Sequence, residues 1–422
     1  MYTAMSQHLK KFGLLTSLYI AQGLPFGFFT QALPALLREK GIGLETIGLG
    51  ALLALPWAAK WLWAPWLDKG QNHRQWIIVA NVIAVFACLL LSRFDLAELA
   101  NEKLWLLYFA FFLLNLTAAS QDIATDAIAV MQLTEAERGI GNGIQVAGYR
   151  VGMILSGGAL LAWFSLLGWE RSVQILAALL ALSTLPILFF NFTSQTLAQN
   201  KEPINKELNT KEYSVKNALW LFNNKSSRLW LFTLSFYKFG DSIASPMLRP
   251  MLIDRGLTIE DIAYLVGTIG FTAGLLGALL GGAVINLIGH RLALRLFLAI
   301  NALAILAYAW VAAGQFSRPS LSPLSLKFAC AFEHFAGGMA TVALFTEMMY
   351  HCRPHHEATD YTFQACLVVL VGILGSVLSG FIAQGYGYSL FFTFCAALTL
   401  AALPMVIWYQ TRADLIVSSC KV

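Results

Sequence analysis

Charge is scarce in this chain of 422 residues. Only 12% of the residues are Asp, Glu, Lys or Arg, whereas soluble domains carry about 25%. This composition excludes an ordinary water-soluble globule. The formal net charge of +5 is too small for a chain of this length to indicate a nucleic-acid-binding surface, so we expect no nucleic-acid partner.

Cysteine is also rare, and the six cysteines form no CxxC pair. The composition therefore favours neither a disulfide framework nor a zinc site. Metal-ligating residue types gather in one segment only, His351-Cys352-Arg353-Pro354-His355-His356. Because Arg353 and Pro354 interrupt this segment and no second cluster accompanies it, we interpret it as a solvated loop. We expect no metal, no cofactor and no enzymatic activity.

The chain is instead rich in long apolar stretches, and 58% of its residues are hydrophobic. A helix needs about 20 apolar residues to cross a bilayer. The stretches lack the alternation of barrel strands, so we predict an all-α membrane protein. Its twelve predicted transmembrane helices are 12–36, 44–67, 75–92, 104–130, 141–166, 172–192, 229–252, 258–285, 293–313, 324–350, 358–385 and 389–410.

A polar segment rich in Lys and Glu divides these helices into two sets of six. We predict an N-terminal six-helix bundle at 1–192, a cytoplasmic linker at 193–228 and a C-terminal six-helix bundle at 229–422. An even number of helices places both termini on one side of the membrane. Lys and Arg are concentrated on the side of the linker, which predicts cytoplasmic termini.

The second half repeats landmarks of the first. Pro34-Ala-Leu-Leu-Arg-Glu-Lys-Gly41 resembles Pro250-Met-Leu-Ile-Asp-Arg-Gly256, and each is followed by a helix with an early Glu. Leu67-Asp68-Lys69-Gly70 with Arg74 corresponds in position to Ile288-Gly289-His290-Arg291 with Arg295. Two parallel repeats of six helices are the architecture of the major facilitator fold. The repeat therefore predicts two pseudo-symmetric bundles and transport by alternating access.

Charged residues at membrane depth are costly and usually functional. Asp122 and Asp126 are four residues apart, which places both carboxylates on one face of a helix. This spacing suits proton coupling or docking of a basic substrate; the alternative is a structural pair with Arg138 or Arg150. Glu333 and Glu347 lie on the repeat partner of this helix, with Glu347 near the place of Asp126. The proton-coupling candidates are Asp122, Asp126, Glu347 and Glu333.

Other polar residues at membrane depth are candidates for binding substrate: Gln22, Lys60, Gln121, Gln145, Tyr149, Arg150, Lys238 and Asp241. Lys60 is flanked by tryptophans, so it either contacts substrate or an ion-pair partner or extends towards the interface. Lys238 and Asp241 either neutralise each other or contact substrate. Asp68, Arg74 and Arg138 are candidates for a gating motif in the loops.

Several of these segments resemble the AmpG-like permeases. The resemblance lies in Gln22-Gly-Leu-Pro25, in Lys60 to Asp68, in Ala119 to Asp126, in Glu137-Arg138-Gly139 and in Gly148 to Met153. It implies a major facilitator transporter of the bacterial inner membrane, a monomer that imports anhydro-muropeptides with protons. Asp122, Asp126, Arg138 and Arg150 fall on shared motif positions. Some muropeptide permeases have two further helices, so a related importer of rhizobactin- or pyochelin-type siderophores, or a permease for another anionic solute, remains an alternative.

Overall fold

The computed structural model describes residues 2–42, 53–70, 72–190, 225–313 and 323–419. Every regular element within these ranges is helical, as the apolar pattern predicted. The chain divides into two compact units, each described here by itself. Most of the predicted linker lies outside the described residues, and its last four residues form the start of a helix.

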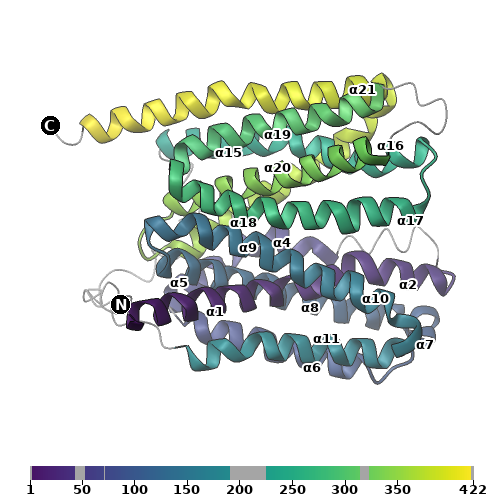
Figure 1. The fold of residues 1–422 in the computed structure, drawn as a ribbon. Helices are drawn as coiled ribbons and strands as arrows, with labels where there is room; N and C mark the ends of the chain where they lie inside the picture. The colour runs from purple at the N-terminus through teal and green to yellow at the C-terminus, as the bar shows by residue number, and fades with distance from the viewer. Residues whose placement is uncertain (1, 43–52, 71, 191–224, 314–322, 420–422) are drawn as a thin grey trace. The chain divides into compact units, whose positions relative to one another are not determined.

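Unit 1 comprises the described residues of 1–134, 147–218 and 352–366. Within it α8 packs against α1, α4 and α6, and α11 packs against α1 and α6 (Figure 1). Its helices are α1 (Tyr2–Gly27), η1 (Phe28–Ala32), α2 (Leu33–Glu39), α4 (Leu55–Ala59), η3 (Lys60–Leu62), α5 (Ala64–Gly70), α6 (His73–Leu91), α7 (Leu96–Asn101), α8 (Leu104–Gln132), the end of α9 (Arg138–Met153), η5 (Ile154–Ala159), α10 (Leu160–Ala162), α11 (Phe164–Phe189) and the start of α21 (Glu357–Ser419).

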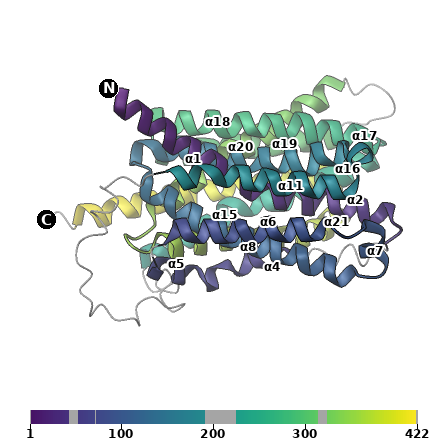
Figure 2. The same ribbon diagram turned by 90° about the horizontal axis from the view of Figure 1, so that it is seen from below.

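Unit 2 comprises the described residues of 135–146, 219–351 and 367–422. Within it α20 packs against α18, α19 and η7. Figure 2 shows α18, α19 and α20 from below. Its helices are η4 (Glu135–Glu137), the start of α9, α15 (Lys225–Ala244), η6 (Ser245–Met247), α16 (Leu248–Asp254), α17 (Ile259–Ile262), η7 (Ala263–Gly270), α18 (Phe271–Ile288), α19 (His290–Ala313), α20 (Pro323–Tyr350) and the remainder of α21.

Each unit buries apolar side chains inside and presents others outside. Phe28 stacks on Phe111 in unit 1 at a centroid distance of 5.9 Å, and Phe391 lies against Phe392 in unit 2. Large apolar side chains such as Leu166 and Phe381 are strongly exposed. Apolar residues on both the inner and the outer faces are what a membrane-embedded helix needs.

Nine of the described helical segments are long and apolar enough to cross a membrane, and twelve spans remain a prediction. Residues 43–52 lie outside the described residues, and the remainder of predicted helix 44–67 is broken into α4, η3 and α5. Predicted helices 358–385 and 389–410 fall within one apolar stretch, Glu357–Arg412. The α15 helix is less apolar because it carries Lys225, Arg228, Lys238 and Asp241.

Glycines with positive φ mark corresponding turns in the two halves of the sequence. Gly41 and Gly256 have φ of 82° and 83°, and Gly168 and Gly387 have φ of 69° and 73°. Glycine adopts positive φ without the steric cost that a side chain adds. Gly387 bends α21 between the two predicted helices that the apolar stretch joins. Two pairs of turn glycines therefore have matching backbone conformations, whereas Gly289, with φ of 81°, has no such counterpart at Gly70.

Candidate functional site

A buried ion pair lies in the interior of unit 1. The Lys60 ammonium contacts the Asp122 carboxylate, and both side chains are largely shielded from solvent. Lys60 occupies the first position of η3, a short 3-10 turn between two prolines, Pro56 and Pro65. Proline cannot continue a preceding helix because it lacks an N–H and its ring collides with an earlier carbonyl. The broken helix thus holds Lys60 opposite α8, with its ammonium directed into the interior of unit 1.

One turn further along α8, Asp126 lies beside α1. The Tyr19 hydroxyl donates to Asp126 Oδ1 at 3.1 Å, and Gln121 Nε2 donates to the Leu18 carbonyl at 3.2 Å. Gln22 is 1% exposed, and its Nε2 has no hydrogen-bond partner among the described residues. Buried amide groups are almost always paired. This unpaired Nε2 is consistent with a polar ligand next to α1.

Aromatic side chains flank the ion pair. Trp57 lies with its ring 5.5 Å from the Lys60 Nζ and donates from Nε1 to Asn115 Oδ1 at 3.0 Å. Phe26 contacts both Trp57 and Tyr149, at centroid distances of 5.8 and 5.7 Å. All three aromatic side chains are partly exposed. They combine flat apolar surface with a neighbouring charged pair, a combination suited to a ligand with both rings and ionised groups.

A close approach of α1 and α9 places these residues together. A Cβ on Gly23 would lie 2.1 Å from the Tyr149 carbonyl oxygen, and a Cβ on Gly152 would lie 2.3 Å from the Ile20 carbonyl oxygen. Small residues at helix contacts permit such close backbone packing in membrane proteins. The glycines therefore bring the α9 turn that carries Tyr149 directly against α1.

The charge balance of this cluster depends on protons. Lys60, Asp122 and Asp126, when all are ionised, carry a net charge of −1. Net charge away from water is costly, so one added proton or one bound cationic group would neutralise the three side chains. The arrangement can therefore link proton binding to ligand binding. No group of three or more His, Cys, Asp or Glu residues in the described part of the chain could hold a metal ion.

Asp68 at the end of α5 binds the first turn of α21. Its carboxylate accepts the backbone N–H groups of Ala358 and Thr359 at 3.0 and 2.8 Å, and also the Thr359 hydroxyl. The first N–H groups of a helix have no partner within the helix. Burial raises the pKa of Asp68 to about 7, although the three hydrogen bonds favour the ionised form.

The same turn contains a second charged contact. Arg353 binds Asp360 through Nε and Nη2, at 2.7 and 2.6 Å. A fork of this kind fixes both position and orientation. Asp68 therefore attaches the start of α21 to α5, while the Arg353–Asp360 pair fixes the segment that leads into the helix.

The other two gating candidates have different neighbours. Arg74 donates to the Leu188 carbonyl near the end of α11. The Arg138 guanidinium lies 4.3 Å from the centre of the Tyr350 ring, within unit 2. The sequence left open that one of the aspartates pairs with an arginine. Asp122 pairs with Lys60 instead, and Arg138 contacts Tyr350. Gln145 is buried on the part of α9 that belongs to unit 2, and Arg150 is half-buried on the part that belongs to unit 1.

Unit 2 contains two further groups of candidate residues. Lys238 and Asp241 form a salt bridge of 2.5 Å within α15, the first of the two predicted alternatives. Glu333 accepts the Tyr308 hydroxyl at 3.2 Å and contacts His334 Nδ1 at 2.8 Å. Each acidic side chain thus has a partner within unit 2.

Glu347 lies near the end of α20, where His290 Nδ1 contacts its Oε2 at 2.5 Å. Close by lies His351, the first residue of the segment that the sequence interpretation assigns to a solvated loop. The structure corrects that interpretation for His351, because its ring stacks on the fully buried Trp230. The apolar surface of Trp230 gives the imidazole a partner that the loop sequence does not reveal.

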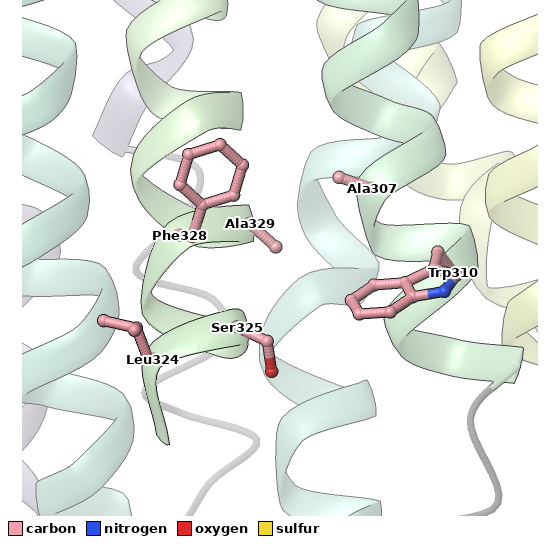
Figure 3. A pocket seen from close by; sticks show the side chains of 6 residues that line it. All are labelled: Ala307, Trp310, Leu324, Ser325, Phe328 and Ala329. Carbon is pink, nitrogen blue, oxygen red and sulfur yellow. The ribbon is translucent and has the colours of Figure 1, made fainter. Parts of the chain in front are cut away.

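A separate apolar groove of about 700 Å³ lies between α19 and α20 (Figure 3). Ser325 and Ala329 on α20 and Trp310 on α19 face the space between the two helices. Trp310 and Phe328 are strongly exposed. Such a surface suits lipid contact, and the groove contains none of the candidate residues.

Sequence reasoning did not identify several residues that contact the candidates or their neighbours. Tyr19 binds Asp126, His290 and Tyr409 contact Glu347, and Cys366 Sγ lies 3.5 Å from the Trp57 carbonyl oxygen. Tyr19 precedes Gln22 by three positions and so shares its helix face. That spacing is the one signal that could have identified it.

Comparison with known proteins places these features in context. The sequence profile described as Major Facilitator Superfamily matches residues 15–375. The anhydromuropeptide permease of Escherichia coli is 28% identical over 417 residues, which cover 95% of this chain and 80% of the permease. An uncharacterised protein of Haemophilus influenzae is 29% identical, with 92% and 91% covered. The human organic anion transporter MFSD10 has the same fold, with a TM-score of 0.72, 14% identity and coverage of 94% and 99%.

Proposed function

Because this chain belongs to the Major Facilitator Superfamily, we propose that it is a secondary active transporter that imports anhydro-muropeptides together with protons. It is a multi-pass membrane protein, and we place it in the bacterial inner membrane with both termini in the cytoplasm. We expect a monomer that works by alternating access. The relatives named as anhydromuropeptide or AmpG permeases support this substrate class.

The observation that carries the proposal is the buried group of Lys60, Asp122 and Asp126 in unit 1. Ionisable residues inside membrane proteins commonly mark substrate or proton pathways. Lys60 would leave Asp122 and bind a carboxylate of the substrate. The freed Asp122 and Asp126 would then compete for a proton, which couples the two binding events.

The aromatic side chains supply the second part of the argument. An anhydro-muropeptide combines amino-sugar rings with a peptide that carries carboxylates. Trp57, Phe26 and Tyr149 offer ring faces next to Lys60. Aromatic faces bind apolar ring surfaces, while a few placed polar groups fix orientation. One site therefore holds both kinds of contact that this substrate class requires.

Uptake assays test this proposal. Cells without their own muropeptide permease would express this protein and receive labelled anhydro-muropeptide, with and without a protonophore. We expect accumulation that the protonophore abolishes. A Lys60→Met variant at equal membrane abundance should lose uptake. Accumulation that persists with the protonophore would contradict proton coupling.

Labelled ferric siderophore, offered in parallel, tests the alternative substrate class. This alternative is kept because the chain covers only 80% of the Escherichia coli permease. Siderophore uptake without muropeptide uptake would overturn the substrate assignment and leave the transport mechanism in place. Uptake of neither compound would contradict both assignments.

A further inference from the structure

A second buried polar cluster lies at one end of unit 2, where α19 begins and α20 ends. Glu347 on α20 is 3% exposed, and its Oε2 contacts His290 Nδ1 at 2.5 Å. Its Oε1 lies 3.5 Å from the Tyr409 hydroxyl on α21. The same hydroxyl contacts His351 Nε2. One tyrosine hydroxyl therefore lies between a carboxylate and an imidazole.

The hydrogen bonds place a hydrogen on one ring nitrogen of His351. Its Nδ1 lies 2.8 Å from the Glu347 backbone carbonyl, which can only accept, so Nδ1 carries a hydrogen and donates. In the neutral ring Nε2 is then an acceptor. The Tyr409 hydroxyl then donates its hydrogen to His351 Nε2, so Glu347 Oε1 receives no hydrogen bond from Tyr409.

Protonation of His351 would reverse this arrangement. The added proton sits on Nε2, which then donates to the Tyr409 oxygen. Tyr409 keeps its own proton and turns it towards Glu347 Oε1, at 3.5 Å in the present geometry. No covalent bond to carbon changes, and the positive charge of the cluster rises by one.

Several other charged or titratable groups face this cluster. His290 stacks on Tyr350 at a centroid distance of 4.1 Å, and Arg291 acts electrostatically on both Glu347 and His351. Tyr350 in turn faces Arg138 and Glu135. A proton on His351 would therefore be added next to the basic groups His290 and Arg291, at a part-buried place where repulsion is strong.

We propose that this cluster is a proton-sensing site separate from the substrate site, in which His351 binds the proton and Tyr409 transmits the change to Glu347. The site then alters the contact between the start of α19 and the end of α20 when the adjacent aqueous phase becomes acidic. Burial lowers the pKa of His351 below its ordinary value, which is consistent with a neutral ring in this geometry.

Trp230 provides a direct optical probe of the proposed proton. Its ring stacks on His351 at a centroid distance of 4.3 Å with an interplanar angle of 12°. A protonated imidazole quenches the fluorescence of an indole in contact with it. The signal of Trp230 among the twelve tryptophans is isolated by subtracting the spectrum of a Trp230→Phe variant.

The first test titrates the full-length protein in detergent and needs no substrate. We expect the Trp230 component to fall as the pH is lowered, with a midpoint below 6.5, the ordinary value for histidine. The titration should vanish in His351→Gln and in His351→Asn. It should persist in His355→Asn, a matched control because His355 has a positive φ of 64° that Asn tolerates. An unchanged titration in both His351 variants would overturn the proposal.

The second test measures the consequence for transport. Proteoliposomes at equal pH on both sides would exchange labelled for unlabelled anhydro-muropeptide, so no proton gradient contributes. We expect the pH dependence of exchange to be reduced at least twofold in Tyr409→Phe, while its Trp230 titration remains. A Tyr409→Phe profile identical to that of the unmodified protein would refute the relay. This arm rests on the proposed function, and the fluorescence arm does not, so the two failures are distinguishable.

Discussion

Asp68 accepts the backbone N–H of Thr359 at 2.8 Å, although 291 positions separate the two residues in the sequence. The carboxylate satisfies N–H groups in the first turn of α21 that have no partner within the helix. Negative charge at this place also interacts favourably with the helix dipole. The contact attaches the start of α21 to α5 within unit 1.

This contact predicts a pH-dependent stability. The ordinary pKa of Asp68 is 3.8, and burial raises it to about 7 in the folded protein. The folded state therefore binds more protons than the unfolded state between these values, and stability falls as the pH rises from about 4 to 7. Thermal unfolding of the protein in detergent across this range would measure the slope.

Asp68→Asn should remove that part of the slope, since the amide does not titrate. Asp95→Asn is the matched control, because Asp95 accepts a helix N–H at 2.9 Å in an exposed position. A difference between the unmodified protein and Asp68→Asn that stays constant from pH 4 to 7 would contradict the expectation.

The buried ion pair predicts a strongly non-additive double-mutant cycle. Lys60→Met leaves the Asp122 carboxylate buried without its partner, which should cost about 3–5 kcal/mol. Adding Asp122→Leu should recover much of that loss. Thermal unfolding midpoints of the two single variants and the double variant would measure the coupling.

The exposed pair Lys103–Glu98, with an N–O distance of 2.5 Å, serves as the control for this cycle. Its disruption by Lys103→Ala should lower the unfolding midpoint far less than Lys60→Met does, because solvent screens an exposed ion pair. Equal losses at the buried and the exposed pair would show that burial of Lys60 and Asp122 is not important for stability.

Asp126 should separate proton coupling from substrate binding. Asp126→Asn resembles the protonated carboxyl and cannot release a proton. We expect gradient-driven accumulation to be largely lost, because intramembrane carboxylates commonly carry the coupled proton. Exchange of labelled for unlabelled substrate, which needs no net proton movement, should continue. Asp261→Asn, at an exposed helix start, is the control and should change neither accumulation nor exchange. Loss of exchange in Asp126→Asn would instead assign Asp126 to substrate binding.

Trp57 should contribute to substrate affinity. Trp57→Ala removes a ring face next to Lys60, and an aromatic contact of about 0.5–1.5 kcal/mol corresponds to a rise in KM of roughly 2- to 10-fold. Initial rates of uptake over a range of substrate concentrations would measure it. Trp66→Ala is the control, because Trp66 lies on α5 with 62% of its surface exposed. A rise in KM of the same size in both variants would indicate a general effect on the membrane-embedded protein.

Gly23 should tolerate no side chain. Gly23→Ala places a Cβ 2.1 Å from the Tyr149 carbonyl oxygen, and overpacking of this kind typically costs about 1–3 kcal/mol. Gly13→Ala on the same helix meets nothing within 4 Å and should be neutral or stabilising. Thermal unfolding of both variants tests the close contact between α1 and α9, and equal midpoints would contradict it.

More of the fold than of the candidate site could be predicted from the sequence. Apolar length and the repeated Pro-to-Gly segments predicted a helical protein of the major facilitator fold, and the sequence profile and the described helices agree. The continuous helix predicted at 44–67 was wrong from α4 onwards, where Pro56 and Pro65 interrupt it. Proline effects are local, so this break was visible in the sequence.

The sequence identified the candidate residues, because charged residues at membrane depth are rare. It did not identify the residues that they contact. Asp122 and Asp126 were placed on one helix face because helical spacing fixes that relation. Lys60 lies 62 positions from Asp122, and nothing in either segment indicates that they meet. The solvated-loop interpretation was wrong for His351 for the same reason, since its partner Trp230 is far away in sequence.

The sequence by itself determined that this is an all-helical membrane protein of the major facilitator fold, because hydrophobic length and periodicity act over neighbouring residues. Only the tertiary structure decided which charges pair: Lys60 with Asp122, Asp68 with the start of α21, and Glu347 with His290. Such pairs depend on where helix packing brings distant side chains within about 3 Å of each other, and packing is a property of the whole unit.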